Sequence, residues 1–315
     1  MTAPLAIGVD IGGTHLRIGL VDRDGGVSGL RRTPTPANDP RSLTEILAEQ
    51  IAAFEEDLPV GIGIAGLVTP DGTVRYGPNI GLRDLPLATA LRSELDRSIA
   101  VLNDASAAAL GEQRFGAGQG FDDLVLFTIG TGVGGGIVLA GRLVLGTSGF
   151  AGELGHLVVA EGGRACPCGN AGCIEAYAAG TAIGRIATER LAQHGRPSAL
   201  RDRPQIDGPA VTAAAAEGDP VAREVLVEVG GWLGVAIANC VNALDPGLVL
   251  IGGGAAVPIA PFVLPSARAA AGARLLGHAY RQAPPIEVAT RGDEAGLLGA
   301  AWYAAGRAAG RGGRT

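Results

Sequence analysis

LAIGVDIGGT, at residues 5–14, decides the fold because a short apolar run leads into a turn rich in glycine. Alternating residues from Leu16 to Val21 follow it, so the segment predicts a hairpin closed by Gly-Gly-Thr. The same order returns in LVLFTIGTGVGGGIVLA, at residues 124–140. We interpret the two copies as an internal duplication of a strand, a turn and a second strand.

Further glycine-rich segments lie at residues 61–66 and at Gly252–Gly254, where they occupy or follow apolar strands. Helical patterns alternate with the strands, which indicates an α/β protein. The expected helices run from Arg41 to Glu55, Pro86 to Arg97, Ala105 to Phe115, Glu175 to Gln193, Val221 to Leu244 and Glu294 to near Ala309. A glycine run at residues 116–120 marks the expected boundary between two domains.

Composition excludes several classes of partner. The 315 residues carry 25 basic and 31 acidic side chains, for a net charge of −6, so a nucleic-acid partner has no electrostatic support. Every basic residue is arginine, and a Walker-type phosphate-binding lysine is therefore absent. Neither a secretory signal nor an apolar run of roughly 18 residues is visible, so we expect a cytoplasmic protein without a membrane partner.

One short window contains three of the four cysteines. The window supplies one imidazole and three thiols, a set that predicts a closed tetrahedral zinc site. These side chains belong to His156, Cys166, Cys168 and Cys173. Their spacing differs from that of zinc fingers, and the alternative is a chance cluster of thiols. The fourth cysteine, Cys240, lies in a helical pattern and is expected to be a buried apolar residue. This distribution favours reduced thiols on a metal over a disulfide framework.

Two carboxylates flank the predicted metal ligands. Glu153 precedes His156 by three residues, and Glu175 follows Cys173 by two. One ring nitrogen of His156 can hold the metal while the other meets a substrate hydroxyl. Carboxylates and an imidazole held in fixed directions suit a polyhydroxylated ligand such as a sugar. The alternative for both glutamates is a surface role or support of the metal ligands.

The Gly/Thr turns suit phosphate, because glycine lets backbone N–H groups approach phosphate oxygens and threonine adds a hydroxyl. Asp10 ends its strand where a carboxylate can face Mg²⁺ directly or through water. A single Gly-Gly-Thr is equally well explained as a tight hairpin. Its recurrence with threonine, together with Gly252–Gly254, favours two hairpins that grip a triphosphate without lysine.

Asn103 and Asp104 stand between an apolar strand, Ala100 to Leu102, and an alanine-rich helix. Both residue types are favoured helix caps, so Asp104 in isolation is explained as a cap. The functional alternative is a general base at a strand–helix junction. Phosphoryl transfer requires such a carboxylate to orient the attacking hydroxyl and accept its proton.

Together these motifs closely resemble the ROK family of repressors, open-reading-frame products and sugar kinases. The match covers nearly the whole chain in the right order, through residues 10–14, 103–104, 130–136, 151–156, 166–175 and 252–254. The resemblance implies an actin/hexokinase-like (ribonuclease H-like) α/β fold of two domains with an interdomain cleft. It also implies that the final helix, at about 294–310, returns to the first domain. With the boundary at the glycine run, we expect a first domain at residues 1–117 and a larger zinc-bearing domain at 118–293. The resemblance also implies a homodimer or higher homo-oligomer.

The resemblance assigns roles to the matching residues. Asp104 is expected to be the catalytic base for the 6-hydroxyl of a hexose. The other sugar contacts are expected at Gly66, Asn79, Asn103, Glu153, His156 and Glu175. The nucleotide and Mg²⁺ contacts are expected at Asp10, Gly12, Gly13, Thr14, Thr131, Gly132, Gly252, Gly253 and Gly254. Structural Zn²⁺ is expected on His156, Cys166, Cys168 and Cys173.

Two features narrow the subfamily, and a third residue departs from the family pattern. ROK repressors carry a helix-turn-helix before the first glycine turn, and Asp10 is expected to leave no room for one. N-acetylmannosamine kinases usually carry histidine at the position of Glu153, so the glutamate resembles a glucokinase. Pro167 replaces the glycine common between the first two cysteines, which stiffens the segment but removes no ligand.

We therefore expect an ATP-dependent glucokinase. The alternatives are an N-acetylmannosamine kinase, a fructokinase, a broad hexokinase, a non-catalytic sugar sensor or a structural zinc protein. Polyphosphate remains an alternative donor to ATP.

Overall fold

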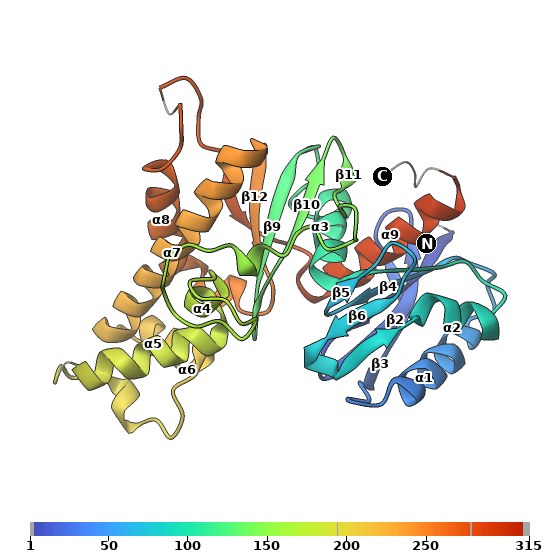
Figure 1. Ribbon diagram of the computed structural model, residues 1–315, viewed down its shortest axis with the longest axis horizontal. Helices are drawn as coiled ribbons and strands as arrows, with labels where there is room; N and C mark the ends of the chain where they lie inside the picture. Colours follow the sequence, from blue (N-terminus) through green and yellow to red (C-terminus); the bar gives the residue numbers. More distant parts are fainter. Residues whose placement is uncertain (1–2, 194, 278, 311–315) are drawn as a thin grey trace. The chain divides into compact units, whose positions relative to one another are not determined.

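The computed structural model describes residues 3–193, 195–277 and 279–310 (Figure 1). It divides into two compact units, the first formed by residues 1–122, 136–152 and 293–315 and the second by residues 123–135 and 153–292. The sequence-based limits placed residues 136–152 in the second domain. This segment packs in the first unit because Gly136 lies directly against Ala105 and Ala109, where a Cβ atom would clash.

A five-stranded sheet forms the centre of the first unit, in the order β3-β2-β1-β4-β8. Its strands are β1 (Pro4–Ile11), β2 (His15–Asp22), β3 (Val27–Pro34), β4 (Val60–Ile64) and β8 (Ile99–Asn103). β1 and β2 are antiparallel, which confirms the predicted hairpin, whereas β1, β4 and β8 run parallel. Alternate side chains of these strands, such as those of Ile7, Val9 and Ile62, are fully buried in the core.

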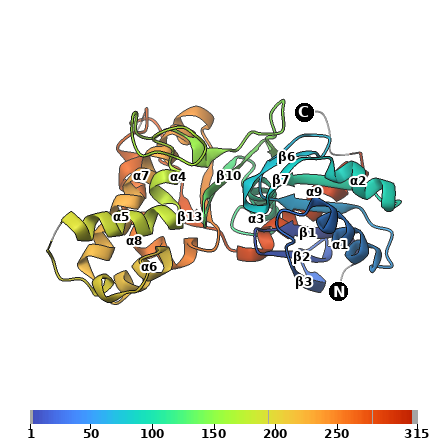
Figure 2. The ribbon, with the colours of Figure 1, turned by 60° about the horizontal axis from the view of Figure 1, so that its bottom comes forward.

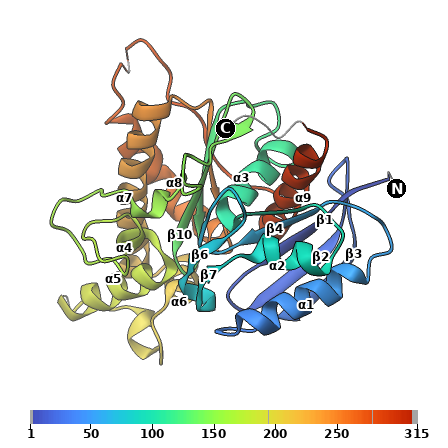
Figure 3. The same cartoon turned by 45° about the vertical axis from the view of Figure 1, so that its right-hand side comes forward.

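Helices α1 (Pro40–Ala52), α2 (Leu87–Glu94), α3 (Asp104–Phe115) and α9 (Ala295–Ala308) complete the first unit. A small sheet adds β5 (Leu67–Val68), β6 (Val74–Gly77) and β7 (Leu82–Leu85). Although α9 comes from the end of the chain, it packs against β1, β4 and α3 (Figure 3). Gly61 permits this packing, because a Cβ atom there would overlap the Ala300 carbonyl group.

The second sheet repeats the strand order of the first, as β11-β10-β9-β12-β13. Its strands are β9 (Leu124–Ile129), β10 (Val133–Leu139), β11 (Arg142–Leu143), β12 (Leu248–Gly252) and β13 (Ile286–Val288). β9, β12 and β13 run parallel, as β1, β4 and β8 do in the first sheet. This common order confirms the internal duplication predicted from the two glycine-turn segments.

The helices of the second unit are α4 (Glu175–Ala178), α5 (Gly180–Gln193), α6 (Gly208–Ala216), α7 (Pro220–Leu244) and α8 (Ala256–Gly272) (Figure 2). The prediction of one continuous helix from Glu175 to Gln193 was wrong. Ala179 is extended, and the N–H of Gly180 donates to the Gly130 carbonyl at 2.8 Å, so that α4 and α5 are separate helices.

Among the described residues, α7 has the length and composition that would allow a helix to cross a membrane, with a mean hydropathy of 1.5 in its most apolar window. Of that window, 61% is buried inside the protein. Extensive packing against α8 accounts for this burial, which is typical of a core helix.

Candidate functional site

The carboxyl ends of three parallel strands gather the acidic candidates of the first unit. In the register of the sheet, Ile11 of β1 lies beside Ile64 of β4, and Ile64 lies beside Asn103 of β8. Asp10, Gly66 and Asp104 therefore stand at the same edge of the sheet. This edge is where ligands bind in open α/β sheets.

Asp10 is held by an arginine that the sequence analysis did not select. Arg17 lies opposite Asp10 in the β1–β2 register, and its Nη2 is 3.1 Å from Asp10 Oδ2. Arg17 also pairs with Asp293 at 3.2 Å. Burial raises the pKa of Asp10 to about 6, the positive charge of Arg17 opposes this rise, and the negative charges of Asp104 and Asp293 add to it. The sequence cue was the antiparallel hairpin, which brings Arg17 across from Asp10.

Asn103, rather than Asp104, is the N-cap of α3. Asn103 Oδ1 accepts a hydrogen bond from the N–H of Ser106 at 2.9 Å, and its Nδ2 donates to the Gly66 carbonyl at 3.1 Å. Asp104 occupies the first helical position, where its Oδ1 accepts from the N–H of Ala105 at 2.9 Å. Burial raises the pKa of Asp104. The capping explanation for Asp104 was therefore wrong, since its neighbour performs that role.

The first glycine turn connects β1 to β2 beside these acids. The N–H of Gly12 donates to the His15 carbonyl at 3.0 Å, and Thr35 Oγ1 donates to the Gly12 carbonyl at 2.8 Å. These bonds fix the turn that contains Gly13 and Thr14. Asn79, an exposed residue of a 3₁₀ turn at Pro78–Ile80, adjoins it: a Cβ at Gly13 would lie 3.5 Å from the Asn79 carbonyl oxygen.

Gly296, near the start of α9, is a second residue that the sequence analysis did not select. A Cβ atom at this position would lie 2.8 Å from Asp10 Oδ1 and 3.8 Å from the Asp104 carbonyl oxygen. The end of the chain thus contributes backbone close to both acids. No local pattern in the sequence indicates this contact, because it depends on the return of α9 to the first unit.

In the second unit, the two remaining glycine turns lie next to each other. β9 and β12 are parallel, with Gly252 beside Thr128. Gly253 has a left-handed φ of 86°, and a Cβ there would lie 2.5 Å from the Ile129 carbonyl oxygen. The N–H of Ala255 donates to that same carbonyl at 3.1 Å. The turn of Thr131 and Gly132 therefore adjoins Gly252–Gly254.

The four predicted metal ligands converge. Their ligand atoms all lie within 4.8 Å of one another, with 3.7 Å between the sulfurs of Cys168 and Cys173 and 3.8 Å between Cys166 Sγ and His156 Nδ1. A tetrahedral zinc ion with Zn–S bonds of about 2.3 Å separates its sulfurs by about 3.8 Å. All four cysteines of the chain are free thiols, and the fourth, Cys240, is buried as expected. The donor set therefore fits a structural zinc ion.

The carboxylates beside these ligands face the imidazole and a glycine turn. His156 presents Nδ1 to the thiols, and its Nε2 lies 3.8 Å from Glu153 Oε2. Glu175 Oε2 accepts a hydrogen bond from the N–H of Val133 at 3.0 Å, while Oε1 lies 3.7 Å from Cys166 Sγ. Glu175 therefore connects the metal-ligand segment to the turn that contains Thr131 and Gly132.

The predicted residues thus form one group in each unit. The first unit brings together Asp10, Gly12, Gly13, Thr14, Gly66, Asn79, Asn103 and Asp104. The second brings together Thr131, Gly132, Glu153, His156, Cys166, Cys168, Cys173, Glu175 and Gly252–Gly254.

Comparison with known proteins gives a consistent result. The profile of the ROK family matches residues 6–307. A glucokinase of Streptomyces coelicolor is 36% identical over 309 residues, covering 94% of this chain and 96% of the relative. A glucokinase of Halalkalibacterium halodurans is 35% identical over 321 residues, covering 94% and 93%.

Among solved structures, the ROK glucokinase of Streptomyces griseus in complex with glucose and AMPPNP has a TM-score of 0.81 and 36% identity. The match covers 95% of this chain and 98% of that one. These likenesses confirm the expected actin/hexokinase-like α/β fold.

Proposed function

The chain belongs to the ROK family, and on this premise we propose that it is an ATP-dependent hexose kinase that phosphorylates the 6-hydroxyl of glucose to glucose 6-phosphate. The similar glucokinases support the proposal, and the S. griseus relative binds both glucose and a nucleotide analogue. The observation that carries it for this chain is Asp104: a half-buried carboxylate beside Asp10, at the first position of α3 rather than at its N-cap.

Asp104 acts as the general base. Its carboxylate accepts the proton of the sugar 6-hydroxyl as that oxygen bonds to the γ-phosphorus and the bond from phosphorus to the leaving ADP oxygen breaks. Burial raises the pKa of Asp104, which makes the ionised group a stronger base than an exposed aspartate. Both glucose 6-phosphate and ADP then leave, and the proton passes to solvent.

Asp10 and the glycine turns hold the nucleotide. Phosphate oxygens accept hydrogen bonds from backbone N–H groups of Gly13 and Thr14, of Thr131 and Gly132, and of the Gly252–Gly254 turn. Gly12 contributes by shaping the first turn, because its own N–H is bonded to the His15 carbonyl. Asp10 fits Mg²⁺, because its carboxylate offers the hard oxygen ligands that this ion prefers. Burial also disfavours the charged form of Asp10 and raises its pKa, and a bound cation would offset that cost. Bound there, Mg²⁺ would neutralise phosphate charge.

Sugar hydroxyls are held by Glu153, His156 and Glu175, with further contacts from Gly66, Asn79 and Asn103. Zinc on His156, Cys166, Cys168 and Cys173 would hold this segment rigid and take no part in proton or phosphoryl transfer. The Nε2 of His156, which faces Glu153 rather than the thiols, meets a hydroxyl. We also propose a cytoplasmic homodimer or higher homo-oligomer, as the family resemblance implies.

The sugar specificity follows from these polar contacts. With ATP as donor, we expect kcat/KM for glucose to exceed that for N-acetylmannosamine, fructose and mannose by at least about tenfold, because a wrong hydroxyl leaves buried groups unpaired. A coupled assay that measures ADP release over this panel provides the test. A preference for N-acetylmannosamine contradicts the glucose assignment, and sugar binding without turnover contradicts the kinase itself. The same assay with polyphosphate in place of ATP tests the donor.

The pH dependence of the activity follows from the two half-buried acids, Asp10 and Asp104. Both must be ionised, and the pKa of each is raised, so activity should increase as pH rises through the pKa of Asp10, about 6. Arg17 lowers the pKa of Asp10, and Arg17→Met should therefore move the acid limb of kcat/KM for ATP to higher pH. Arg75→Met is the matched control, since Arg75 pairs with the exposed Asp84. An acid limb that stays in place or moves to lower pH excludes Asp10 as the titrating group.

A further inference from the structure

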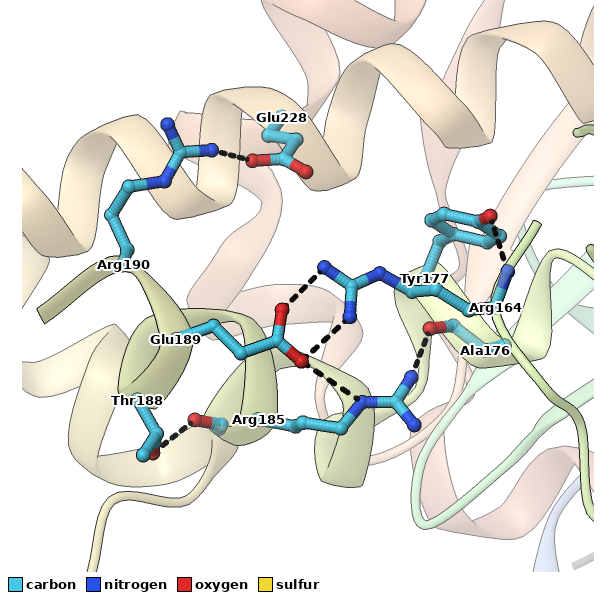
Figure 4. A network of polar contacts seen from close by, with 9 residues as sticks. Arg164, Ala176, Tyr177, Arg185, Thr188, Glu189, Arg190 and Glu228 are labelled. Atoms are coloured by element: carbon cyan, nitrogen blue, oxygen red, sulfur yellow. Dashed lines mark hydrogen bonds and ion pairs between the residues drawn. The ribbon is translucent and has the colours of Figure 1, made fainter. Parts of the chain in front are cut away.

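A cluster of charged side chains on α5 holds the segment that carries the predicted metal ligands. Arg164 lies two residues before Cys166, and its guanidinium donates two parallel hydrogen bonds to Glu189 of α5, at 2.8 and 2.6 Å (Figure 4). Bidentate pairs of this kind fix direction as well as distance. The pairing raises the pKa of Arg164 and lowers that of Glu189, so both groups are charged at neutral pH.

The backbone of Arg164 is also fixed. Its N–H donates to the hydroxyl of Tyr177 at 2.9 Å, and its carbonyl accepts from the N–H of Gly172 at 2.7 Å. Tyr177 is 5% exposed and packs on Trp232, with ring centroids 4.6 Å apart. The entry to the metal-ligand segment is therefore anchored to a residue that stands two positions after Glu175.

Glu175 itself lies on a helix that needs an external tether. α4 has four residues and is separated from α5 by the extended Ala179, so helix continuity does not set its direction. Arg185 of α5 supplies the tether, because its Nη2 donates to the carbonyl of Ala176 at 2.7 Å. Arg185 Nε also lies 3.9 Å from Glu189 Oε1, one helical turn away (Figure 4). Residues of α5 one turn apart therefore bind Arg164, which precedes Glu175 in the sequence, and Ala176, which follows it.

We infer that Arg164, Arg185 and Glu189 are positioning residues that direct the carboxylate of Glu175 toward the sugar and thereby set the affinity for the hexose. This inference rests on the proposed function. Arg190 joins α5 to α7 separately, by its ion pair with Glu228 (Figure 4). The charge of Glu228 acts on Arg164 without a hydrogen bond or ion pair between the two in the described residues.

Glu189→Gln tests the inference, because it removes one charge and one acceptor of the bidentate pair while keeping the side-chain shape. We expect KM for glucose to rise by about tenfold, the lower end of the effect of removing such supporting bonds. The KM for ATP should change less than the KM for glucose, because Glu175 contributes a single hydrogen bond, from the N–H of Val133, beside the nucleotide turn. Glu228→Gln is the matched control: it breaks an ion pair of the same helix and should leave both KM values unchanged.

Exchange of the two charges, Arg164→Glu with Glu189→Arg, should recover part of the glucose affinity lost in the single variant, since it restores an Arg–Glu pair but removes the ion pair between Arg185 and position 189. Arg185→Met isolates the second tether, since it leaves the Arg164–Glu189 pair intact, and should raise KM for glucose in the same direction. Zinc content, measured by elemental analysis, should remain that of the unaltered protein in every variant.

Three outcomes overturn the inference. The first is an unchanged KM for glucose in Glu189→Gln and Arg185→Met, whatever their melting temperatures. The second is a loss of glucose affinity that follows loss of zinc, because the cluster then acts on the metal. The third is a rise in KM for glucose that Glu228→Gln reproduces.

If Glu189→Gln does not fold, the KM values of Arg185→Met and of the exchanged pair decide whether the inference holds. An unaltered protein without sugar kinase activity instead overturns the proposed function.

Discussion

Asp104→Asn is expected to lower kcat for glucose phosphorylation by about 10²–10⁴ while leaving the Kd for glucose within about twofold. The amide keeps the shape of the side chain and can still accept the hydrogen bond from the N–H of Ala105. It cannot accept the proton of the 6-hydroxyl. Steady-state kinetics and calorimetric titration with glucose measure the two quantities separately.

The control for this prediction is Asp39→Asn, another aspartate at a helix start in the same unit. Asp39 caps α1 by accepting from the N–H of Ser42 at 3.0 Å, and asparagine caps equally well. We therefore expect normal kinetics and stability from this variant. If the Asp104→Asn protein turns over glucose at the normal rate, Asp104 is not the general base. If the variant no longer binds glucose, Asp104 is a sugar-binding residue.

Replacement of a buried member of the proposed zinc-ligand set should have the second largest effect. Cys173 is fully buried, and Cys173→Ser removes a thiolate from the set of four. We expect loss of zinc, a lower melting temperature, and a rise of about 10- to 100-fold in KM for glucose, since Glu153 and Glu175 lie in the segment that the metal organises. Elemental analysis, thermal unfolding and the coupled assay give the three values.

Cys240→Ser provides the matched control, because Cys240 is also buried and lies outside the cluster. Its zinc content and KM for glucose should equal those of the unaltered protein, even if burial of a hydroxyl lowers stability. A Cys173→Ser protein that keeps both its zinc and its glucose affinity contradicts the metal assignment. Chelation of the unaltered protein should reproduce the effect of Cys173→Ser.

The repeated hairpin could be predicted because its signals are local. Asp10 follows an apolar run, glycines follow Asp10, and the same order returns after Leu124. The zinc set was equally local, with its four ligands within 18 residues from His156 to Cys173. By contrast, the choice between a cap and a base for Asp104 required coordinates, because Asn103 and Asp104 are both good caps.

Elements stabilised by distant contacts were missed. α8 contains Pro261 and Pro265, residues that usually end a helix, and its pattern was therefore not recognised. Packing against α7 buries Ile259 and Val263 and compensates for the lost backbone bonds. The pair of Arg164 and Glu189 spans 25 residues, and no spacing rule in a single sequence predicts such a contact.

The return of α9 to the first sheet has a consequence for biosynthesis. Strands β1 and β4 leave the ribosome early, yet the helix that covers them lies far later in the sequence. Until Ala295–Ala308 is synthesised, the apolar surface opposite Gly8 and Gly61 stays uncovered, and such surfaces promote aggregation of nascent chains. The first sheet of this protein therefore completes its packing only after Ala295–Ala308 has been synthesised.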